Sequence, residues 1–376
     1  MREMKDSGVR WIGKIPTKWT IAKAKNCVEI QNGSDPKTEG SIPVYGSGSM
    51  SFKTCGEYKE GPSVLIGRKG ATLHIPHYIS SKFWNVDTVF NVYSKSIFDL
   101  KYYFYCAHVF DYTLYMSQTT LPSMTQTAYE NMFLPLPTKE EQYAIANQLD
   151  QICSKIDAVL EKTRTSIEEY KKLKQAVITQ AVTKGIRGDR PMKHSGIEWI
   201  GDIPAEWDYT KAKNCVNIQN GSDPKTEGSI PVYGSGASSF KTCGEYKEGP
   251  SVLIERKGAT LHIPHYISTK FWNVDTAFNV YAKPNFDLKF YFYCACSFDY
   301  RFYISQTTLP SMTQTAYENM FLPLPSNDEQ RAIASYLDNR CEEIDALIWK
   351  KQECLVEIEN YKKSLIYEYV TGKREV

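Results

Sequence analysis

Four short polar segments, each present in two nearly identical copies 188 residues apart, carry residue types that could hydrogen-bond to nucleic acid. They are "GSDPKTEG", "VYGSG", "IGRKGA" ("IERKGA" in the second copy) and "SQTTLPSMTQ". Arginine and lysine are the usual donors to guanine O6 and N7, and glutamine suits adenine. The candidate DNA contacts are Lys37, Tyr45, Ser47, Arg68, Lys69, Gln118, Thr119 and Thr120 in the first copy and Lys225, Tyr233, Ser235, Arg256, Lys257, Gln306, Thr307 and Thr308 in the second.

Each of these segments also has an interpretation that involves no base contact. Arg68 and Lys69 could form a solvated turn between two strands, and Gln118 could belong to a polar loop with only a structural role. Any of the lysines could contact phosphate, which positions a protein on a duplex without reading its sequence. The residues alone leave these alternatives open.

Patterns typical of catalysis or cofactor binding are absent from the sequence. There is no "NPPY" methyltransferase motif, no Walker loop and no strand-linked GxGxxG, while "GEYK" lacks the preceding aspartate of an E-x-K nuclease site. His74 and His77 lie three residues apart, as do His262 and His265, but two imidazoles without a third ligand make a weak metal site. We therefore expect a non-catalytic chain that itself binds no metal or cofactor.

Composition and charge are those of an ordinary globular protein. The 376 residues have a formal net charge of +2. Residues 1–138 carry 15 Lys and Arg against 11 Asp and Glu, and residues 189–325 carry 13 against 14. A free-standing nucleic-acid binder usually has a plainly basic domain. If the chain binds DNA, we expect partners to supply much of the attraction to phosphate.

Cysteine usage and hydropathy indicate the cellular compartment of the protein. The ten cysteines include no CxxC motif, which favours buried reduced thiols over disulfides or a metal site. No apolar run approaches the roughly 20 residues that span a bilayer, and the first residues lack the apolar core of a signal peptide. We expect a cytoplasmic protein that does not associate with membranes.

The whole chain is an internal duplication. The offset of 188 holds without a gap from Ser7 against Ser195 to Val177 against Leu365, and the 21 residues from Ser117 to Pro137 recur unchanged. The first part of each copy has short apolar alternations punctuated by glycine and proline, which predict strands, with "LKYYFYCA" as a short helix.

The second part of each copy predicts one long helix, from Glu140 to Lys184 in the first. "LPLPTKEEQ" and "LPLPSNDEQ" are good helix starts, with Thr138 or Ser326 as N-cap and Glu141 or Glu329 completing a capping box. Apolar residues then follow heptad spacing, which predicts helix pairing. The predicted seam contains Ile145, Leu149, Ile152, Ile156, Val159, Ile167, Tyr170, Val177 and Ala181, and in the second helix Ile333, Leu337, Ile344, Leu347, Leu355, Ile358, Leu365 and Tyr369.

Chain order then predicts the architecture. A helix of about 45 residues rises about 1.5 Å per residue, so the second globular part should begin roughly 65 Å away and the second helix should run back along the first. We predict an α+β protein in which two similar α/β domains are separated by two long helices forming an antiparallel coiled coil, with approximate two-fold symmetry. Pairing between two chains stays open as an alternative. The predicted segments are 1–138, 139–185, 186–325 and 326–376.

An ordered set of motifs resembles the specificity subunit of type I restriction–modification systems. The set comprises "SGVRWIGKIPTKW" with "SGIEWIGDIPAEW", "IPVYGSG", "LPLP..EQ.AIA..LD" and "IDA" before a long helix, and it covers essentially the whole chain. The resemblance implies two target-recognition domains, each reading half of a bipartite site in double-stranded DNA, and two conserved helical regions that set the spacing.

The same resemblance implies a set of partners. Two methyltransferase subunits would dock on the helices, and restriction endonuclease subunits that translocate DNA would join them in defence against foreign DNA. S-adenosylmethionine, ATP and Mg²⁺ are expected on those partners, with none bound by this chain.

The two recognition domains are nearly identical, unlike those of many members of the family, so we expect a gapped and nearly palindromic site. In the long segment that both copies share, the differences are Gly67 against Glu255, Ser81 against Thr269, Val89 against Ala277, and Ser49–Met50 against Ala237–Ser238. An extra carboxylate next to Arg256 could loosen one half-site.

Two other functions remain possible on the sequence. In the first, the chain is a protein–protein scaffold and the repeated 21 residues are a docking surface, which its aromatic richness would suit. In the second, it is a nuclease with its own specificity domain. Sequence-independent DNA binding would favour the scaffold, and metal-dependent cleavage by the purified chain would be needed for the nuclease.

Overall fold

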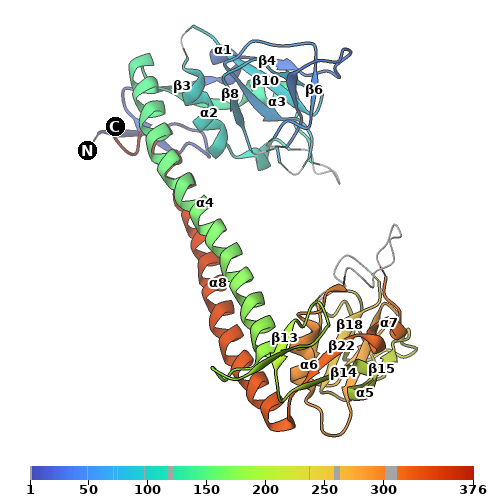
Figure 1. Cartoon of the computed structure of the whole chain (residues 1–376). Helices are drawn as coiled ribbons and strands as arrows, with labels where there is room; N and C mark the ends of the chain where they lie inside the picture. The colour runs from blue at the N-terminus through green and yellow to red at the C-terminus, as the bar shows by residue number, and fades with distance from the viewer. Residues whose placement is uncertain are drawn as a thin grey trace. The chain divides into compact units, whose positions relative to one another are not determined.

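The computed structural model describes residues 2–48, 50–70, 72–73, 75–96, 98–116, 122–236, 238–257, 263–300 and 311–376. These residues form two compact units, one made of Met1–Arg164 with Glu353–Val376 and the other of Thr165–Gln352. Each unit combines small antiparallel sheets, short helices and part of two long helices, so the predicted mixed fold with two similar domains and long helices is confirmed (Figure 1). The division into four sequential segments stays a prediction.

The first unit is built on a four-stranded antiparallel sheet in the order β4-β10-β7-β8. A second sheet, β6-β5-β9, joins its last two strands in parallel, and two ribbons pair β1 with β2 and β3 with β11. Short apolar alternations such as "PSVLIG" and "FWNVDTVFNVY" supply strands of these sheets, as this type of pattern predicts. The strands are β1 (Met4–Asp6), β2 (Lys14–Pro16), β3 (Thr20–Lys23), β4 (Val28–Asn32), β5 (Ile42–Tyr45), β6 (Lys53–Cys55), β7 (Ser63–Gly67), β8 (His77–Ile79), β9 (Trp84–Asn85), β10 (Val89–Ser94) and β11 (Phe133–Leu136).

The second unit repeats this topology with the same registers, in the orders β15-β21-β18-β19 and β17-β16-β20. Its strands are β12 (Met192–His194), β13 (Asp202–Pro204), β14 (Asp208–Lys211), β15 (Val216–Asn220), β16 (Ile230–Tyr233), β17 (Lys241–Cys243), β18 (Ser251–Glu255), β19 (His265–Ile267), β20 (Trp272–Asn273), β21 (Ala277–Ala282) and β22 (Phe321–Leu324).

Helices complete both units. The predicted helix at "LKYYFYCA" is α2, whose aromatic side chains fill the core and whose N-cap Asp99 accepts a hydrogen bond from the amide of Tyr102. No helix in the described part of the chain is both long and apolar enough to cross a bilayer. The helices are α1 (Ala24–Cys27), α2 (Leu100–Val109), α3 (Gln126–Asn131) and α4 (Lys139–Lys184), a 3₁₀ turn at Tyr112–Leu114, and α5 (Ala212–Cys215), α6 (Leu288–Ala295), α7 (Gln314–Asn319) and α8 (Asn327–Val370).

The start of α4 is anchored by the residues that predicted it. The Glu141 amide donates to Thr138 Oγ1 and the Thr138 amide to Glu141 Oε2, both at 3.3 Å, which confirms the capping box. The indole of Trp19 also donates to Glu141 Oε2 at 3.0 Å. In α8 the Glu329 amide donates to Ser326 Oγ, and Trp207 Nε1 donates to Glu329 Oε2. Trp19 of "SGVRWIGKIPTKW" and Trp207 of "SGIEWIGDIPAEW" therefore help to fix the two helix starts.

The heptad seam is present, but the prediction is wrong at two positions. Val159 is 49% exposed and Leu347 is 42% exposed. Leu160 is buried instead, at 4% exposure, and Ile348 is half-buried. In both helices an apolar residue lies next to the true seam position, and alternating steps of three and four fit either choice. The inward positions run through Cys153, Ile156, Leu160, Thr163, Ile167, Tyr170, Lys174, Val177 and Ala181, and through Leu337, Cys341, Ile344, Ile348, Lys351, Leu355, Ile358, Lys362, Leu365 and Tyr369.

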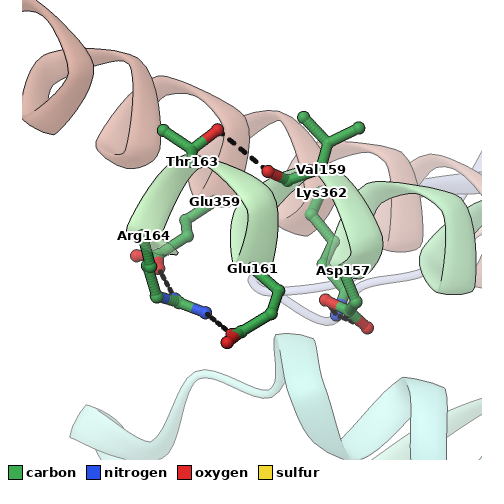
Figure 2. A network of polar contacts seen from close by, with 7 residues as sticks. All are labelled: Asp157, Val159, Glu161, Thr163, Arg164, Glu359 and Lys362. Carbon is green, nitrogen blue, oxygen red and sulfur yellow. Dashed lines mark hydrogen bonds and ion pairs between the residues drawn. The ribbon is translucent and has the colours of Figure 1, made fainter. Parts of the chain in front are cut away.

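Helices α4 and α8 of the same chain pair antiparallel within each unit. In the first unit Lys362 Nζ lies 2.6 Å from Asp157 Oδ1, and Arg164 Nη2 lies 2.7 Å from Glu359 Oε1 (Figure 2). In the second, Lys174 Nζ lies 2.6 Å from Asp345 Oδ2. Asp345 and Lys362 are the repeat counterparts of Asp157 and Lys174, so the same ion pair forms in both units with the two helices exchanging roles.

The core of each unit is completed by the end of the other repeat's helix. Leu365, Ile366, Tyr369 and Val370 of α8 belong to the core of the first unit, and the buried hydroxyl of Tyr102 donates to the carbonyl of Val370 at 2.7 Å. The core of the second unit contains Ile178, Ala181 and Val182 of α4. Neither repeat therefore buries its full core without residues from the other.

We expect Leu365→Ala to destabilise the first unit by about 2–5 kcal/mol, because it leaves a cavity where the side chain is 2% exposed. Hydrogen exchange should show lost protection in residues 2–164 and retained protection in residues 165–352. Val356→Ala, on an exposed side chain of the same helix, is the matched control and should change stability by less than about 0.5 kcal/mol. Equal losses in the two variants would contradict this assignment of the core.

Candidate nucleic-acid interface

The predicted basic turn is present where β7 ends. The amide of Arg68 donates to the carbonyl of Thr88 at 2.8 Å, and the carbonyl of Arg68 accepts from the amide of Met124 at 2.9 Å. The guanidinium lies 5.8 Å from the ring centroid of Phe90, and Nη1 donates to the carbonyl of Asp87 at 3.4 Å. The backbone of the turn is thus fixed between the β9–β10 connection and the segment before α3, while both basic side chains remain at the surface.

A hollow of about 260 Å³ lies beside this turn. Two amide side chains meet in it, with Asn32 Nδ2 donating to Gln126 Oε1 at 2.9 Å. Lys69 is paired with Asp87 at 3.7 Å, but both side chains are about half exposed, so solvent screens this pair and the ammonium can contact another anion. The hollow is lined by Asn32, Arg68, Lys69, Phe90, Ser123, Met124, Thr125 and Gln126.

The turn after β5 lies next to the basic turn. The carbonyl of Ser47 accepts a hydrogen bond from the hydroxyl of Thr72, and a Cβ placed on Gly70 would lie 3.6 Å from Ser47 Oγ. Tyr45 accepts from the amide of Val86 at 3.0 Å, in the same β9–β10 connection that holds Arg68. The structure therefore brings Ser47, Arg68 and Lys69 together, and Tyr45 is the last residue of β5, just before the turn that carries Ser47.

Lys37 is held elsewhere, by the carboxylate of Glu57. The Lys37 amide donates to Glu57 Oε1 at 2.6 Å, while the amide and hydroxyl of Thr38 donate to Glu57 Oε2 at 3.2 and 2.7 Å. These hydrogen bonds, the one from Thr38 first, lower the pKa of Glu57 from 4.5 to about 2. Glu57 fixes the loop between β4 and β5, and the Lys37 side chain is exposed on it.

The second copy reproduces these contacts. The Arg256 amide donates to the carbonyl of Thr276 at 2.8 Å, and the Met312 amide donates to the carbonyl of Arg256 at 2.9 Å. Lys257 pairs with Ser311 in an isolated bridge, as Lys69 does with Ser123. The Lys225 loop is held by Glu245, and the Tyr233 carbonyl accepts from Val274. Ser235 lies on the turn after β16, where its amide donates to Thr276 Oγ1 at 3.1 Å.

Several predicted residues cannot be placed. Gln118, Thr119 and Thr120 lie outside the described residues, and so do their counterparts Gln306, Thr307 and Thr308. His74 and His262 also lie outside them. His77 and His265 are described, and burial lowers the pKa of each imidazole. Within the described ranges, no group of three His, Cys, Asp or Glu side chains is arranged to hold a metal ion.

Sequence reasoning missed Lys59, which the structure places between the sheets. Its ammonium donates to the Asn85 and Asn91 side-chain oxygens at 2.8 and 2.6 Å and to the carbonyl of Asn32 at 3.1 Å. It also lies 5.4 Å from the ring centroid of Trp84. Burial lowers the pKa of this lysine. Lys247 makes the same contacts in the second copy. These residues recur in the second copy, but so does almost every residue between Ile30 and Tyr93, so no signal in the sequence singled them out.

Comparison with known proteins gives consistent matches. A family model described as "Type I restriction modification DNA specificity domain" matches residues 16–169 and again residues 204–355. The type I restriction enzyme MjaVIII specificity subunit of Methanocaldococcus jannaschii is 27% identical over 69% of this chain, and the match spans 66% of that protein, just under two thirds of its length. The EcoBI specificity subunit of Escherichia coli is 21% identical over 99% of this chain and 90% of its own length.

A solved structure has the same fold. It comes from work titled as the structural basis of complex assembly and conformational transition of the type I R-M system. The two chains superpose with a TM-score of 0.74 over 96% of this chain and 99% of that one, at 15% sequence identity. At this identity the likeness shows the fold alone.

Because the pKa of Glu57 is lowered to about 2, its contribution to the stability of the loop is present above pH 4.5 and is lost as the pH falls from 4.5 towards 2. An NMR titration should find Glu57 still ionised at about pH 3.5, where an unperturbed glutamate is largely protonated. In Thr38→Val the carboxylate should protonate at higher pH. Glu245, held by Thr226 in the other copy, serves as the internal control and should not change. A wild-type Glu57 that titrates near 4.5 would contradict this role.

Proposed function

This chain belongs to the type I restriction modification DNA specificity family, and on that premise we propose that it reads a bipartite DNA site as the non-catalytic specificity subunit of a methyltransferase and endonuclease complex. One observation carries the proposal. Each repeat presents an Arg–Lys turn fixed by the same backbone hydrogen bonds, at the same position of the same fold. Two copies of one reading surface suit two similar half-sites.

The chemistry of the hollow supports base reading in addition to phosphate contact. Arg68 can donate two hydrogen bonds to guanine, and Asn32 carries an amide of the kind that matches adenine. Gln126 orients Asn32, because its Oε1 accepts from Asn32 Nδ2 while its Nε2 donates to the carbonyl of Ile30 and to Glu130 Oε1. Lys69 is exposed on the rim and suits phosphate. Asn32 and Gln126 were not among the candidates predicted from the sequence, and they extend the proposed interface.

The long helices support docking of partner subunits. Helix α8 exposes large apolar side chains away from its seam, among them Trp349 at 57%, Val356 at 58% and Tyr361 at 56%. Exposed aromatic residues of this kind are enriched in protein interfaces. We propose that the methyltransferase subunits bind these helices and, with the endonuclease subunits, bring S-adenosylmethionine, ATP and Mg²⁺, and much of the positive charge that this chain lacks.

We expect Arg68→Ala to relax discrimination at one base position by about 1–3 kcal/mol, and Lys69→Ala to weaken binding to all sequences and reduce the salt dependence by about one unit of slope. Gel shifts of the assembled complex on cognate and scrambled duplexes measure both effects. Arg256→Ala and Lys257→Ala should act alike on the other half-site. Lys82→Ala, on an exposed side chain stacked over Tyr58, is the matched control. Binding that is equal on scrambled DNA would favour the scaffold function.

We also expect the methylated motif in cells that express the chain with its partners to consist of two similar half-sites in inverted orientation, separated by a fixed gap. Methylome sequencing reports this directly. Two unrelated half-sites would contradict the assignment of the repeated turns as readers, because identical surfaces should select related bases.

A further inference from the structure

Two of the differences between the domains face each other across one sheet. Between Ile30 and Tyr93 and between Ile218 and Tyr281, the copies are identical except at the five positions already given. Gly67 pairs directly with Val89 across β7 and β10, and Glu255 pairs directly with Ala277 across β18 and β21. Side chains that oppose each other across antiparallel strands pack together. In the first domain the small Gly67 faces the larger Val89, and in the second the large Glu255 faces the smaller Ala277. Each pair therefore combines one larger and one smaller residue.

Glu255 is buried although it immediately precedes the basic turn. Its exposure is 1%, and Oε1 accepts a hydrogen bond from the amide of Gly236 at 2.8 Å. The carboxylate therefore does not face the DNA-binding surface as a direct reader. It joins the end of β18 to the turn after β16, which carries the candidate contact Ser235.

The first domain cannot form this contact in the conformation it adopts. A Cβ placed on Gly67 would lie 2.6 Å from Cα and 3.2 Å from Cδ2 of Leu73. In the first domain, the carbonyl of Ser47 on the turn after β5 accepts a hydrogen bond from the hydroxyl of Thr72; the counterpart of Thr72 lies outside the described residues.

The two turns have correspondingly different backbones. Gly236 has a φ of +128°, a conformation that residues with a side chain rarely adopt, whereas its counterpart Gly48 lies outside that region. The next residues also differ, with Met50 in the first copy and Ser238 in the second. Differences in sequence, hydrogen bonding and backbone thus coincide at one turn beside the basic residues of each domain.

We propose that Glu255 is a positioning residue for DNA specificity. Its buried carboxylate holds the amide of Gly236 and so sets the position of Ser235 relative to Arg256 and Lys257. That position differs from the position of Ser47 relative to Arg68 and Lys69 in the first domain. The two domains then prefer different bases at the one position that this turn faces. The inference rests on the proposed function and refines it, because the recognised site becomes a palindrome broken at one corresponding position.

The test uses the complex of this chain with its methyltransferase subunits and a randomised duplex library. The site selected by the wild type should differ from its own reverse complement at one pair of symmetry-related positions, one in each half-site, with a preference of about tenfold between bases, as expected for a single base-pair mismatch. Glu255→Gly with Ala277→Val gives the second domain the pair that the first already has. The selected site should then equal its reverse complement.

Glu255→Gln keeps an acceptor for the Gly236 amide and should retain the wild-type site. Midpoints of thermal unfolding for each variant separate a change in reading from a loss of folding, since the swapped pair already occurs in this chain.

The outcomes separate the two proposals. A complex that selects no sequence at all rejects the proposed function and this inference with it. A complex that selects a fully symmetric site in the wild type, or an asymmetric site that the swapped variant leaves unchanged, rejects only the role of Glu255.

Discussion

The structure depends on the exchange of helix ends between the two repeats. Each globular core is finished by apolar residues from the last turns of the other repeat's helix, and the carbonyl of Val370 is bound by a hydroxyl buried in the first core. Hydrophobic burial is the dominant favourable term in folding, so this exchange ties the stability of each domain to the helices that pair beside it. The candidate DNA-contacting turns lie on these cores, so their positions depend on the same apolar helix ends.

The inward positions of the paired helices include polar residues among the apolar ones. Thr163, Lys174, Lys351 and Lys362 occupy inward positions, and the two symmetric lysines pair with aspartates on the facing helix. Exposed ion pairs contribute little stability, typically below about 1 kcal/mol, but like charges brought together by a shifted register would be unfavourable. These pairs therefore act mainly to select the antiparallel register, while Leu160, Ile167 and the core residues supply the burial.

Much of this fold could be predicted from periodicity and capping residues, and the errors have physical causes. The helix starts could be predicted because Thr138 and Glu141 form a local capping motif. The spacing could not tell whether Val159 or Leu160 faces the other helix, because both fit it. Pairing within one chain or between two gives the same heptad pattern, so the sequence left it open. In the candidate interface, Arg68 and Lys69 were proposed from residue type alone. Asn32 and Gln126 were not, because their meeting joins segments 94 residues apart. The role of Lys59 was hidden because it depends on two asparagines from other strands.

The partial burial of Lys59 and Lys247 has an electrostatic consequence for a chain whose net charge is only +2. In the contacts described, each ammonium donates hydrogen bonds to neutral amide and carbonyl oxygens and to no carboxylate. These oxygens stabilise the positive charge without neutralising it. One of these oxygens belongs to Asn32, which lines the hollow beside the basic turn. Fixed charges in a medium of low dielectric extend their potential further than charges on mobile surface side chains do. The fold thus places a lysine ammonium close behind the hollow of the candidate interface, in addition to the basic side chains on its rim.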